Sequence, residues 1–232
     1  MPTKSSKGSG SRFLTVKLKK SRGRSISSQR WLQRQLNDPY TQEAQKLGYR
    51  SRAAFKLKQI HEKYNILKPN MRVVDLGAAP GGWCQVLIEH IDTSKPGNEI
   101  VAIDILEMEP MAGVTTLQLD FEDHDAPEIL KSKMSGSADL VLSDMAPPTT
   151  GHKNTDHLRI MSLVEMAYDF AEQILAPGGV FAAKVFQGGT EQEILKKLKK
   201  DFEKVHHFKP GSSRKDSSEM FVVALGFKKK QS

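Results

Sequence analysis

The chain has 232 residues, of which 38% are hydrophobic and 7% aromatic, and its formal net charge at pH 7 is +8. This length and composition are typical of one full-sized globular domain with a small addition. No apolar run approaches the roughly 18 residues that a membrane-spanning helix needs, and the N-terminus lacks the apolar stretch of a secretory signal. Because its single cysteine, Cys84, can form no internal disulfide, the composition predicts a cytoplasmic protein without a membrane partner.

The positive charge is concentrated at the N-terminus. Residues 1–37 contain ten Lys or Arg and no Asp or Glu, so the rest of the chain carries a net charge of −2. This segment is also rich in Ser and Gly and has too little apolar surface to fold alone. Clustered cations on a flexible segment bind polyanions because binding releases counterions. We therefore predict a basic flexible arm over 1–37, either for nucleic acid or as a solubilising tail, and a single domain over 38–232.

Patterns typical of helices and strands alternate from about residue 50 onward. The segment SRAAFKLKQIHEKY (51–64) begins with a serine and has apolar residues on one helical face. Further helices are expected near 83–92, 126–134, 156–175 and 190–203, and LAPGG (175–179) predicts a helix end followed by a turn. Runs rich in Val, Ile, Leu and Phe predict buried strands at 70–77, 98–104, 114–120, 138–144, 178–186 and 220–227. This alternation predicts an α/β fold with a doubly wound, mostly parallel sheet and helices on both faces.

Four carboxylates stand at or near the ends of the first four predicted strands: Asp75, Asp104, Asp120 and Asp144. In such a sheet the ligand binds beyond the carboxyl ends of the strands. The glycine-rich turn GAAPGG (77–82) follows the first strand and allows a close approach to the backbone. A nucleotide-like cofactor is therefore predicted at this edge.

The glycine-rich turn is compatible with two kinds of cofactor, a dinucleotide and S-adenosylmethionine. Gly77, Ala79 and Gly82 occupy the places of a dinucleotide-binding motif, and Asp104 follows at about the distance of its ribose-binding acid. However, Pro80 removes a backbone N–H group that a pyrophosphate would need. S-adenosylmethionine has no phosphate, and its cationic sulfonium and ammonium groups suit an acidic pocket. The residues favour a methyltransferase over a dehydrogenase.

Five segments in order resemble the FtsJ/RrmJ (RlmE-type) family of 23S ribosomal RNA 2′-O-ribose methyltransferases. They are RSRAAFKL, VVDLGAAPGGW, SDMAPPTTG, LAPGGVFAAKVFQG and SSRKDSSEMFVVALG, and the likeness runs from about residue 38 to 226. The resemblance implies a Rossmann-like enzyme that uses S-adenosylmethionine to methylate a uridine ribose in large-subunit ribosomal RNA during ribosome maturation. The family's cofactor-binding residues fall on Gly81, Trp83, Asp104, Asp120 and Asp144. Its catalytic set falls on Lys56, Asp144, Lys184 and Glu219.

The residues themselves agree with these roles. Lys184 stands in an otherwise apolar strand, where burial favours the neutral amine that can take a proton from a ribose hydroxyl or orient that hydroxyl. Lys56 flanks the apolar stripe of its helix, whereas Lys58 points away from it, so Lys56 is the candidate for holding ribose or phosphate. Asp144 is expected to pair with Lys184 and to orient the methyl donor and the hydroxyl, and Glu219 either to pair with a lysine or to bind the ribose.

Other interpretations remain open at this point. Loops like SDMAPP occur in methyltransferases that modify base amino groups, but an aromatic residue then follows the prolines, whereas Thr149 follows them here. His152 and His157 lack a recognisable third ligand, and the adjacent His206 and His207 would point to opposite faces of a strand, so no metal is expected. Arg214 and Lys215 are either phosphate contacts or parts of a solvated loop.

We expect ribosomal RNA within the large subunit as the partner and a monomeric protein. The alternatives are a 2′-O-methyltransferase of transfer RNA or another RNA, and a non-catalytic RNA-binding ribosome-assembly factor.

Overall fold

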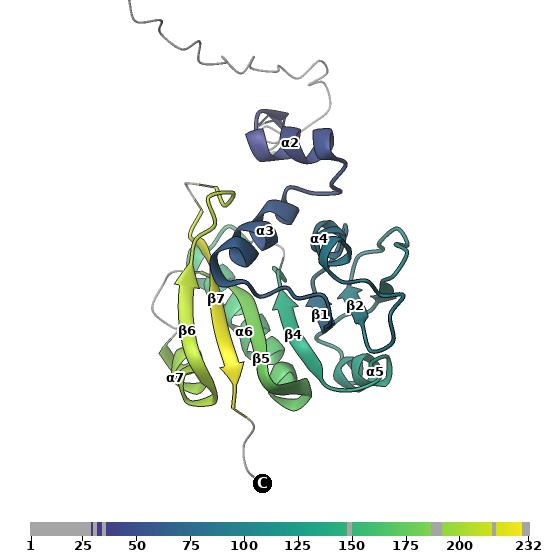
Figure 1. Ribbon diagram of the computed structural model, residues 1–232. Coiled ribbons are helices and arrows are strands. Elements are labelled where there is room, and N and C mark those ends of the chain that lie inside the picture. The colour runs from purple at the N-terminus through teal and green to yellow at the C-terminus, as the bar shows by residue number, and fades with distance from the viewer. Residues whose placement is uncertain are drawn as a thin grey trace, which may run out of the picture.

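The computed structural model describes residues 29, 32–33, 36–147, 150–186, 192–214 and 217–228, which form a seven-stranded sheet with helices around it (Figure 1). The strands are β1 (Arg72–Leu76), β2 (Glu99–Asp104), β3 (Thr115–Gln118), β4 (Ala138–Ser143), β5 (Leu175–Phe186), β6 (Phe202–Phe208) and β7 (Glu219–Phe227). Their order is β3-β2-β1-β4-β5-β7-β6. The first five strands are parallel, and β7 runs antiparallel between β5 and β6.

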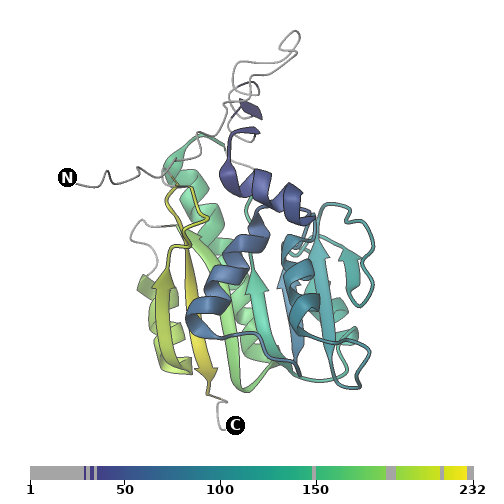
Figure 2. The ribbon, with the colours of Figure 1, turned by 45° about the horizontal axis from the view of Figure 1, so that its top comes forward.

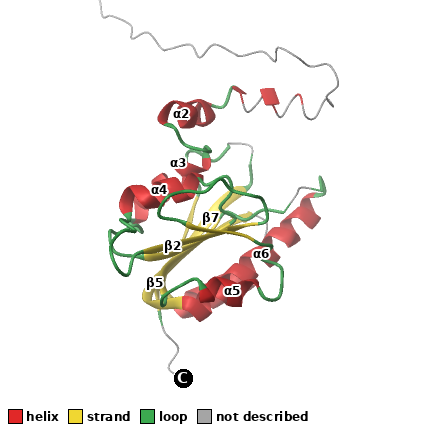
Figure 3. Cartoon of the chain, turned by 90° about the vertical axis from the view of Figure 1, so that its right-hand side faces the viewer, coloured by secondary structure: helices red, strands yellow, loops and turns green. Residues whose placement is uncertain are grey.

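Helices cover both faces of the sheet (Figure 3). Helices α3 (Ala53–Tyr64) and α4 (Gly82–His90) lie on one face, and α5 (Ala126–Ser132), α6 (Lys153–Ile174) and α7 (Gln192–Asp201) on the other. Leu57 of α3 and Leu87 of α4 belong to one buried cluster, and Val164 of α6 and Leu198 of α7 to the other. The predicted doubly wound, mostly parallel α/β sheet is confirmed.

Two elements were not predicted. Helix α2 (Pro39–Leu47) begins at Asp38, whose Oδ1 accepts hydrogen bonds from the N–H groups of Tyr40 and Thr41. Strand β6 begins at Phe202, where the pattern predicted the end of a helix. Only Ala44 of α2 is buried, and β6 is a half-exposed edge strand with the sequence FEKVHHF. Neither segment therefore has the apolar pattern by which the other elements were predicted.

The LAPGG segment (175–179) differs from its prediction as a turn before the next strand. Helix α6 ends at Ile174 as expected, but β5 already begins at Leu175, which pairs with Ala138. The next pair of the ladder joins Leu140 to Val180, so the residues between these two pairs form an irregularity in the ladder of β4 and β5.

The predicted basic arm lies almost wholly outside the described residues. Within 1–37, the structure describes Gln29, Leu32, Gln33 and Leu36, which are helical, and Asn37, which is in a turn. Thr149 and Lys215 also lie outside the described residues. None of the described helices combines the length and apolar character needed to cross a membrane.

Helix α2 lies beyond one edge of the sheet, beside the start of α3 (Figure 2). This is the edge at which the parallel strands end. The order of the elements therefore brings the N-terminal helices, the glycine-rich turn and the ends of β4 and β5 together.

Candidate active site

The four residues with predicted catalytic roles meet at this edge from four parts of the chain. Lys56 lies on α3, Asp144 directly follows β4, Lys184 lies near the end of β5, and Glu219 begins β7. Because β7 runs antiparallel to β5, Glu219 pairs with Phe186 and so lies beside the end of β5. Only the fold brings these positions together, since 163 residues separate Lys56 from Glu219.

Their side chains form a cluster in which two lysine amines alternate with two carboxylates. Lys184 Nζ lies 3.0 Å from Asp144 Oδ1 and donates a hydrogen bond of 2.5 Å to the Asp144 main-chain oxygen. Lys56 Nζ lies 3.4 Å from both carboxylate oxygens of Asp144 and 3.0 Å from Glu219 Oε1. Ser213 Oγ donates a 2.9 Å hydrogen bond to the same Glu219 oxygen. Lys184 is only 7% exposed, so these contacts replace water around its amine.

The charges of this cluster stabilise one another. Burial lowers the pKa of Lys56, but the carboxylates of Asp144 and Glu219 outweigh it, so the pKa of Lys56 lies above its usual value. Burial raises the pKa of Asp144, but Lys184 and Lys56 outweigh it and hold that pKa below its usual value. At neutral pH, Lys56 is therefore an ammonium and Asp144 a carboxylate.

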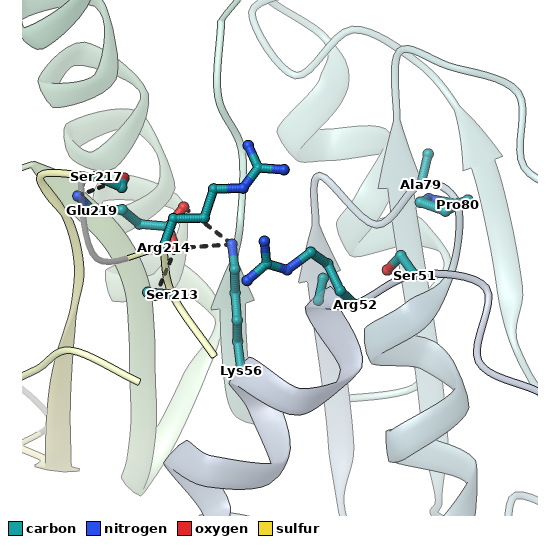
Figure 4. A pocket seen from close by; sticks show the side chains of 10 residues that line it. Ser51, Arg52, Lys56, Ala79, Pro80, Ser213, Arg214, Ser217 and Glu219 are labelled. Atoms are coloured by element: carbon teal, nitrogen blue, oxygen red, sulfur yellow. Dashed lines mark hydrogen bonds and ion pairs between the residues drawn. The ribbon is translucent and has the colours of Figure 1, made fainter. Parts of the chain in front are cut away.

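A cavity of about 470 Å³ opens beside this cluster (Figure 4). We call it the basic cavity; it is lined by Ser51, Arg52, Ala53, Lys56, Ala79, Pro80, Ser213, Arg214, Ser217 and Glu219. Arg52 pairs with Asp38 and donates to the Ser212 main-chain oxygen, and Arg214 Nε lies 3.7 Å from the same Asp38 carboxylate. Asp144 and Lys184 are not part of this lining and are linked to it through Lys56. Its three cations suit a phosphate-bearing ligand.

A second cavity lies on the other side of the glycine-rich turn. We call it the acidic cavity; it is lined by Gly77, Ile103, Asp104, Ile105, Leu119, Asp120, Phe121, Glu122, Met145, Ala146, Pro147, Arg159 and Leu163. A Cβ at Gly77 would lie 2.8 Å from the Met145 backbone, and Gly77 has a φ of +79°, so only glycine fits there. Ala79 and Pro80 line the basic cavity and Gly77 the acidic one, so the turn separates the two.

Asp104 and Asp120 both lie in the acidic cavity, as the pattern of strand ends led us to expect. Asp104 accepts 2.9 Å hydrogen bonds from the N–H groups of Ala79 and Leu106, which ties the turn to the loop after β2. Asp120 accepts from the Glu122 N–H at 2.9 Å. Each carboxylate still has lone pairs for the hydroxyl or amino donors of a ligand.

The sequence assigned Gly81 and Trp83 to cofactor binding but did not predict which of their atoms could contact a cofactor. Gly81 precedes the first turn of α4 with a φ of +106°. The Trp83 side chain is buried and donates from its ring nitrogen to the Ala53 oxygen at 2.8 Å, so it belongs to the core and lines neither cavity. Its backbone N–H lies in the first turn of α4, where such groups lack helical partners and suit an anion. Any contact of Trp83 with a cofactor must therefore use the main chain.

Asp75 differs from the other strand-end acids. It is fully buried within β1 and lines neither cavity. Its Oδ2 accepts a hydrogen bond from Cys84 Sγ at 3.4 Å, whereas its Oδ1 has no partner among the described residues. Burial raises the pKa of Asp75 to about 7, although the Cys84 hydrogen bond lowers it. Asp75 is therefore part of the support beneath the turn.

Sequence reasoning overlooked the roles of Arg52 and Ser213 at the basic cavity. Arg52 stands four residues before Lys56, and this spacing places both on one face of the helical segment. That spacing was the available signal for Arg52. No sequence pattern linked Ser213 to Glu219, because their contact depends on the path of the loop between them.

Comparisons with known proteins identify the family and support the fold. A family model described as FtsJ-like methyltransferase matches residues 49–227. The chain belongs to the FtsJ-like methyltransferase family. The protein named Ribosomal RNA large subunit methyltransferase E from Paramagnetospirillum magneticum is 59% identical, over 97% of this chain and 93% of that protein. Its namesake from Maricaulis maris is 59% identical over 91% of this chain and 74% of its own length.

A solved structure supports the same conclusion. The crystal structure titled as that of a ribosomal RNA methyltransferase from Plasmodium falciparum matches with a TM-score of 0.67 and 33% identity. The match covers 77% of this chain and 98% of that chain. Family membership confirms the predictions of a methyltransferase and of S-adenosylmethionine as its methyl donor.

The residues of this FtsJ-like methyltransferase fit that donor. The acidic cavity offers Asp104 and Asp120 to hydroxyl and amino groups between apolar walls that suit an adenine ring. Gly77 and Gly81 keep side chains out of the turn, and the first turn of α4 suits the donor's carboxylate. Among the described residues no group of three or more His, Cys, Asp or Glu is arranged to hold a metal ion.

Proposed function

We propose that this protein methylates the ribose 2′-hydroxyl of a uridine in 23S ribosomal RNA, the RNA of the large subunit, during ribosome maturation. The names of its relatives support ribosomal RNA of the large subunit as the substrate. The single observation that carries the proposal is the cluster of Lys56, Asp144, Lys184 and Glu219 beside a basic cavity. A cavity with this charge suits RNA, and the amines suit a hydroxyl acceptor.

The acidic cavity and the glycine-rich turn would hold the donor. Asp104 would accept from its ribose hydroxyls, Asp120 from its adenine amino group, and Gly81 and the Trp83 main chain would face its methionine end. S-adenosylmethionine supplies an electrophilic methyl group on a sulfonium, which passes in line to the acceptor oxygen as the carbon–sulfur bond breaks.

Lys184 is the proposed base for the acceptor hydroxyl. A neutral lysine has two N–H donors and one lone pair. The main-chain oxygen and Oδ1 of Asp144 lie at 2.5 and 3.0 Å and occupy two donor positions, so a lone pair is left for the hydroxyl proton. The Asp144 carboxylate then stabilises the ammonium that forms.

Lys56 and Glu219 would position the acceptor. Lys56 is the cation of the cluster that lines the basic cavity, so it would contact the ribose or its phosphate. Glu219 holds Lys56 in place and is itself held by Ser213. Asp144 contacts both lysines and so fixes the distance between base and substrate.

We further propose that the protein acts in the cytoplasm as a monomer and meets its RNA within the large subunit. Residues of one chain are enough to line both cavities, so neither cavity requires a partner subunit. The flanking cations Arg52 and Arg214 would meet phosphates near the target ribose.

The test is methylation of total cellular RNA with isotope-labelled donor, followed by mapping of the modified ribose. We expect label on a uridine 2′-oxygen of 23S RNA with the natural protein, no label with Lys184→Ala, and equal donor affinity for both. Lys58→Ala is the matched control, because Lys58 lies on α3 but pairs with Glu89 away from the cluster.

Each other outcome identifies what is wrong. Label on transfer RNA would identify transfer RNA as the substrate in place of 23S RNA. Donor binding without methylation of any RNA would favour a non-catalytic assembly factor. Near-normal turnover by Lys184→Ala would remove Lys184 as the base.

A further inference from the structure

Arg50 joins two loops that border the donor side of the active site. It lies just before α3, and its guanidinium donates to the main-chain oxygens of Pro80 at 3.3 Å, Glu109 at 2.7 Å and Pro110 at 3.1 Å. Pro80 belongs to the glycine-rich turn, and the other two belong to the loop that follows β2. One side chain therefore binds three backbone oxygens from both loops.

These loops depend on side chains for their polar contacts. Among the described residues, no backbone hydrogen bond joins 79–81 to 105–111. Asp104 links the loops near the acidic cavity through Ala79 and Leu106, and Arg50 links them further along. Ile105 and Leu106 are 61% and 65% exposed, so little apolar packing holds the start of the second loop, whereas Met108 and Met111 further along it pack against the cluster that contains Ala78. Removing Arg50 would leave Asp104 as the remaining polar link identified between them.

Arg50 is itself held by α4. Its backbone N–H donates to Gln85 Oε1 at 2.6 Å, and Gln85 Nε2 donates to the Gly48 oxygen at 2.9 Å. A Cβ at Gly81 would lie 3.0 Å from Arg50 Nη1 and 3.1 Å from Met108 Sδ, so the turn, Arg50 and the second loop are closely packed. The guanidinium is thus a fixed point against which both loops are placed.

We propose that Arg50 is a positioning residue for the methyl donor. It fastens the loop at 105–111 to the glycine-rich turn and so forms the donor site in advance of binding. Without it, part of the binding free energy would be spent on ordering the loop. The proposal rests on the proposed function, because it assigns the donor to these two loops.

The experiment compares Arg50→Ala with Arg72→Ala by calorimetric titration with S-adenosylmethionine and by steady-state kinetics. Arg72 is the matched control: it is also half-buried, contacts Ser135 and Glu99, and lies at the opposite end of β1. Losing these charged hydrogen bonds should raise the Kd for the donor about tenfold in Arg50→Ala. We expect kcat at saturating donor and KM for RNA to change less than about twofold, and Arg72→Ala to bind donor normally.

Arg50→Lys provides a second measurement if Arg50→Ala folds poorly. Lysine keeps the charge but lacks the planar fork that reaches several oxygens, so its donor Kd should lie between those of the natural protein and Arg50→Ala. Unchanged donor affinity in a folded variant would overturn the proposal, as would a raised KM for RNA with unchanged donor affinity. Failure of the natural protein to bind the donor would instead overturn the proposed function.

Discussion

Asp75 is fully buried and Asp144 is partly buried near the glycine-rich turn, yet their pKa values move in opposite directions. Asp144 has two lysines beside it, which hold its pKa low in spite of burial. Asp75 accepts a hydrogen bond from a thiol on one oxygen and has no partner for the other among the described residues. The charges of Asp144 and Asp104 add to the effect of its burial. The same residue type is therefore a charged part of the active site in one place and a pH-sensitive structural group in the other.

The pKa of Asp75 predicts a pH-dependent stability. This carboxyl ionises near pH 3.8 in the unfolded chain and near pH 7 in the folded protein, so between these values the folded state binds more protons. Its contribution to the free energy of unfolding is therefore complete below the lower value and is lost as the pH rises through about 7. In Asp75→Asn, the fall in Tm between pH 5 and pH 8.5 should be smaller than in the natural protein.

Thermal unfolding followed by circular dichroism at both pH values checks this expectation. Asp123→Asn is the control, because it also removes a carboxylate but from an exposed position. An equal fall in Tm for the natural protein and Asp75→Asn would contradict the assignment.

At the scale of elements, polar contacts at the N-terminus of α2 connect this helix to the start of α3. Asp38 caps the helix with one carboxylate oxygen and pairs with Arg52 through the other, so one residue joins α2 to the start of α3. α2 buries only Ala44, and its Tyr40 ring contacts Phe55 of α3 at 5.4 Å between centroids, so these polar contacts supply a large part of what orders it. The same contacts place Arg52 in the basic cavity.

Asp38→Ala should release α2 from the domain. Loss of the cap costs about 1 kcal/mol, which makes backbone amide exchange in α2 about five times faster. Asp38→Asn keeps a capping oxygen but loses the charge that pairs with Arg52, so its exchange should be less affected. Hydrogen exchange followed by mass spectrometry over 39–47 measures both variants. The same exchange rate in Asp38→Ala and the natural protein would mean that other contacts order α2.

At the scale of the whole molecule, the largest group of cations lies in a different part of the chain from the residues that line the two cavities. Ten cations lie within 1–37, whereas both cavities are built from residues 51 onward. RNA binding through residues 1–37 would depend on counterion release and respond to salt, whereas donor binding would depend on the folded domain.

Deleting residues 1–37 should therefore weaken RNA binding and flatten its dependence on salt, while donor affinity stays the same. Each phosphate contact that is lost reduces the magnitude of the negative slope of log K against log salt by about 0.7 to 0.9. Filter binding of ribosomal RNA fragments over a range of salt concentrations gives this slope. An unchanged slope would show that the arm contributes no phosphate contacts.

Strands and helices with a strong apolar pattern were predictable because that pattern follows from burial on one or both faces. The strand containing Lys184 and the helix containing Lys56 were found in this way. Helix α2 and strand β6 were not, because a cap and an antiparallel neighbour stabilise them without such a pattern. Likewise, nothing local showed that the Trp83 side chain faces the core or that Arg50 reaches three distant carbonyl groups.

The sequence by itself determined the α/β class, the glycine-rich turn, the acids at the strand ends and, through resemblance, the residues proposed to be catalytic. These features depend on local pattern and on the order of motifs along the chain. Only the tertiary structure decided that the turn separates an acidic from a basic cavity, that Lys56 bridges Asp144 and Glu219, and that Asp75 is buried beneath the turn. The physical reason is that contacts between distant residues, and the burial that sets their charges, exist only once the sheet has brought its strand ends together.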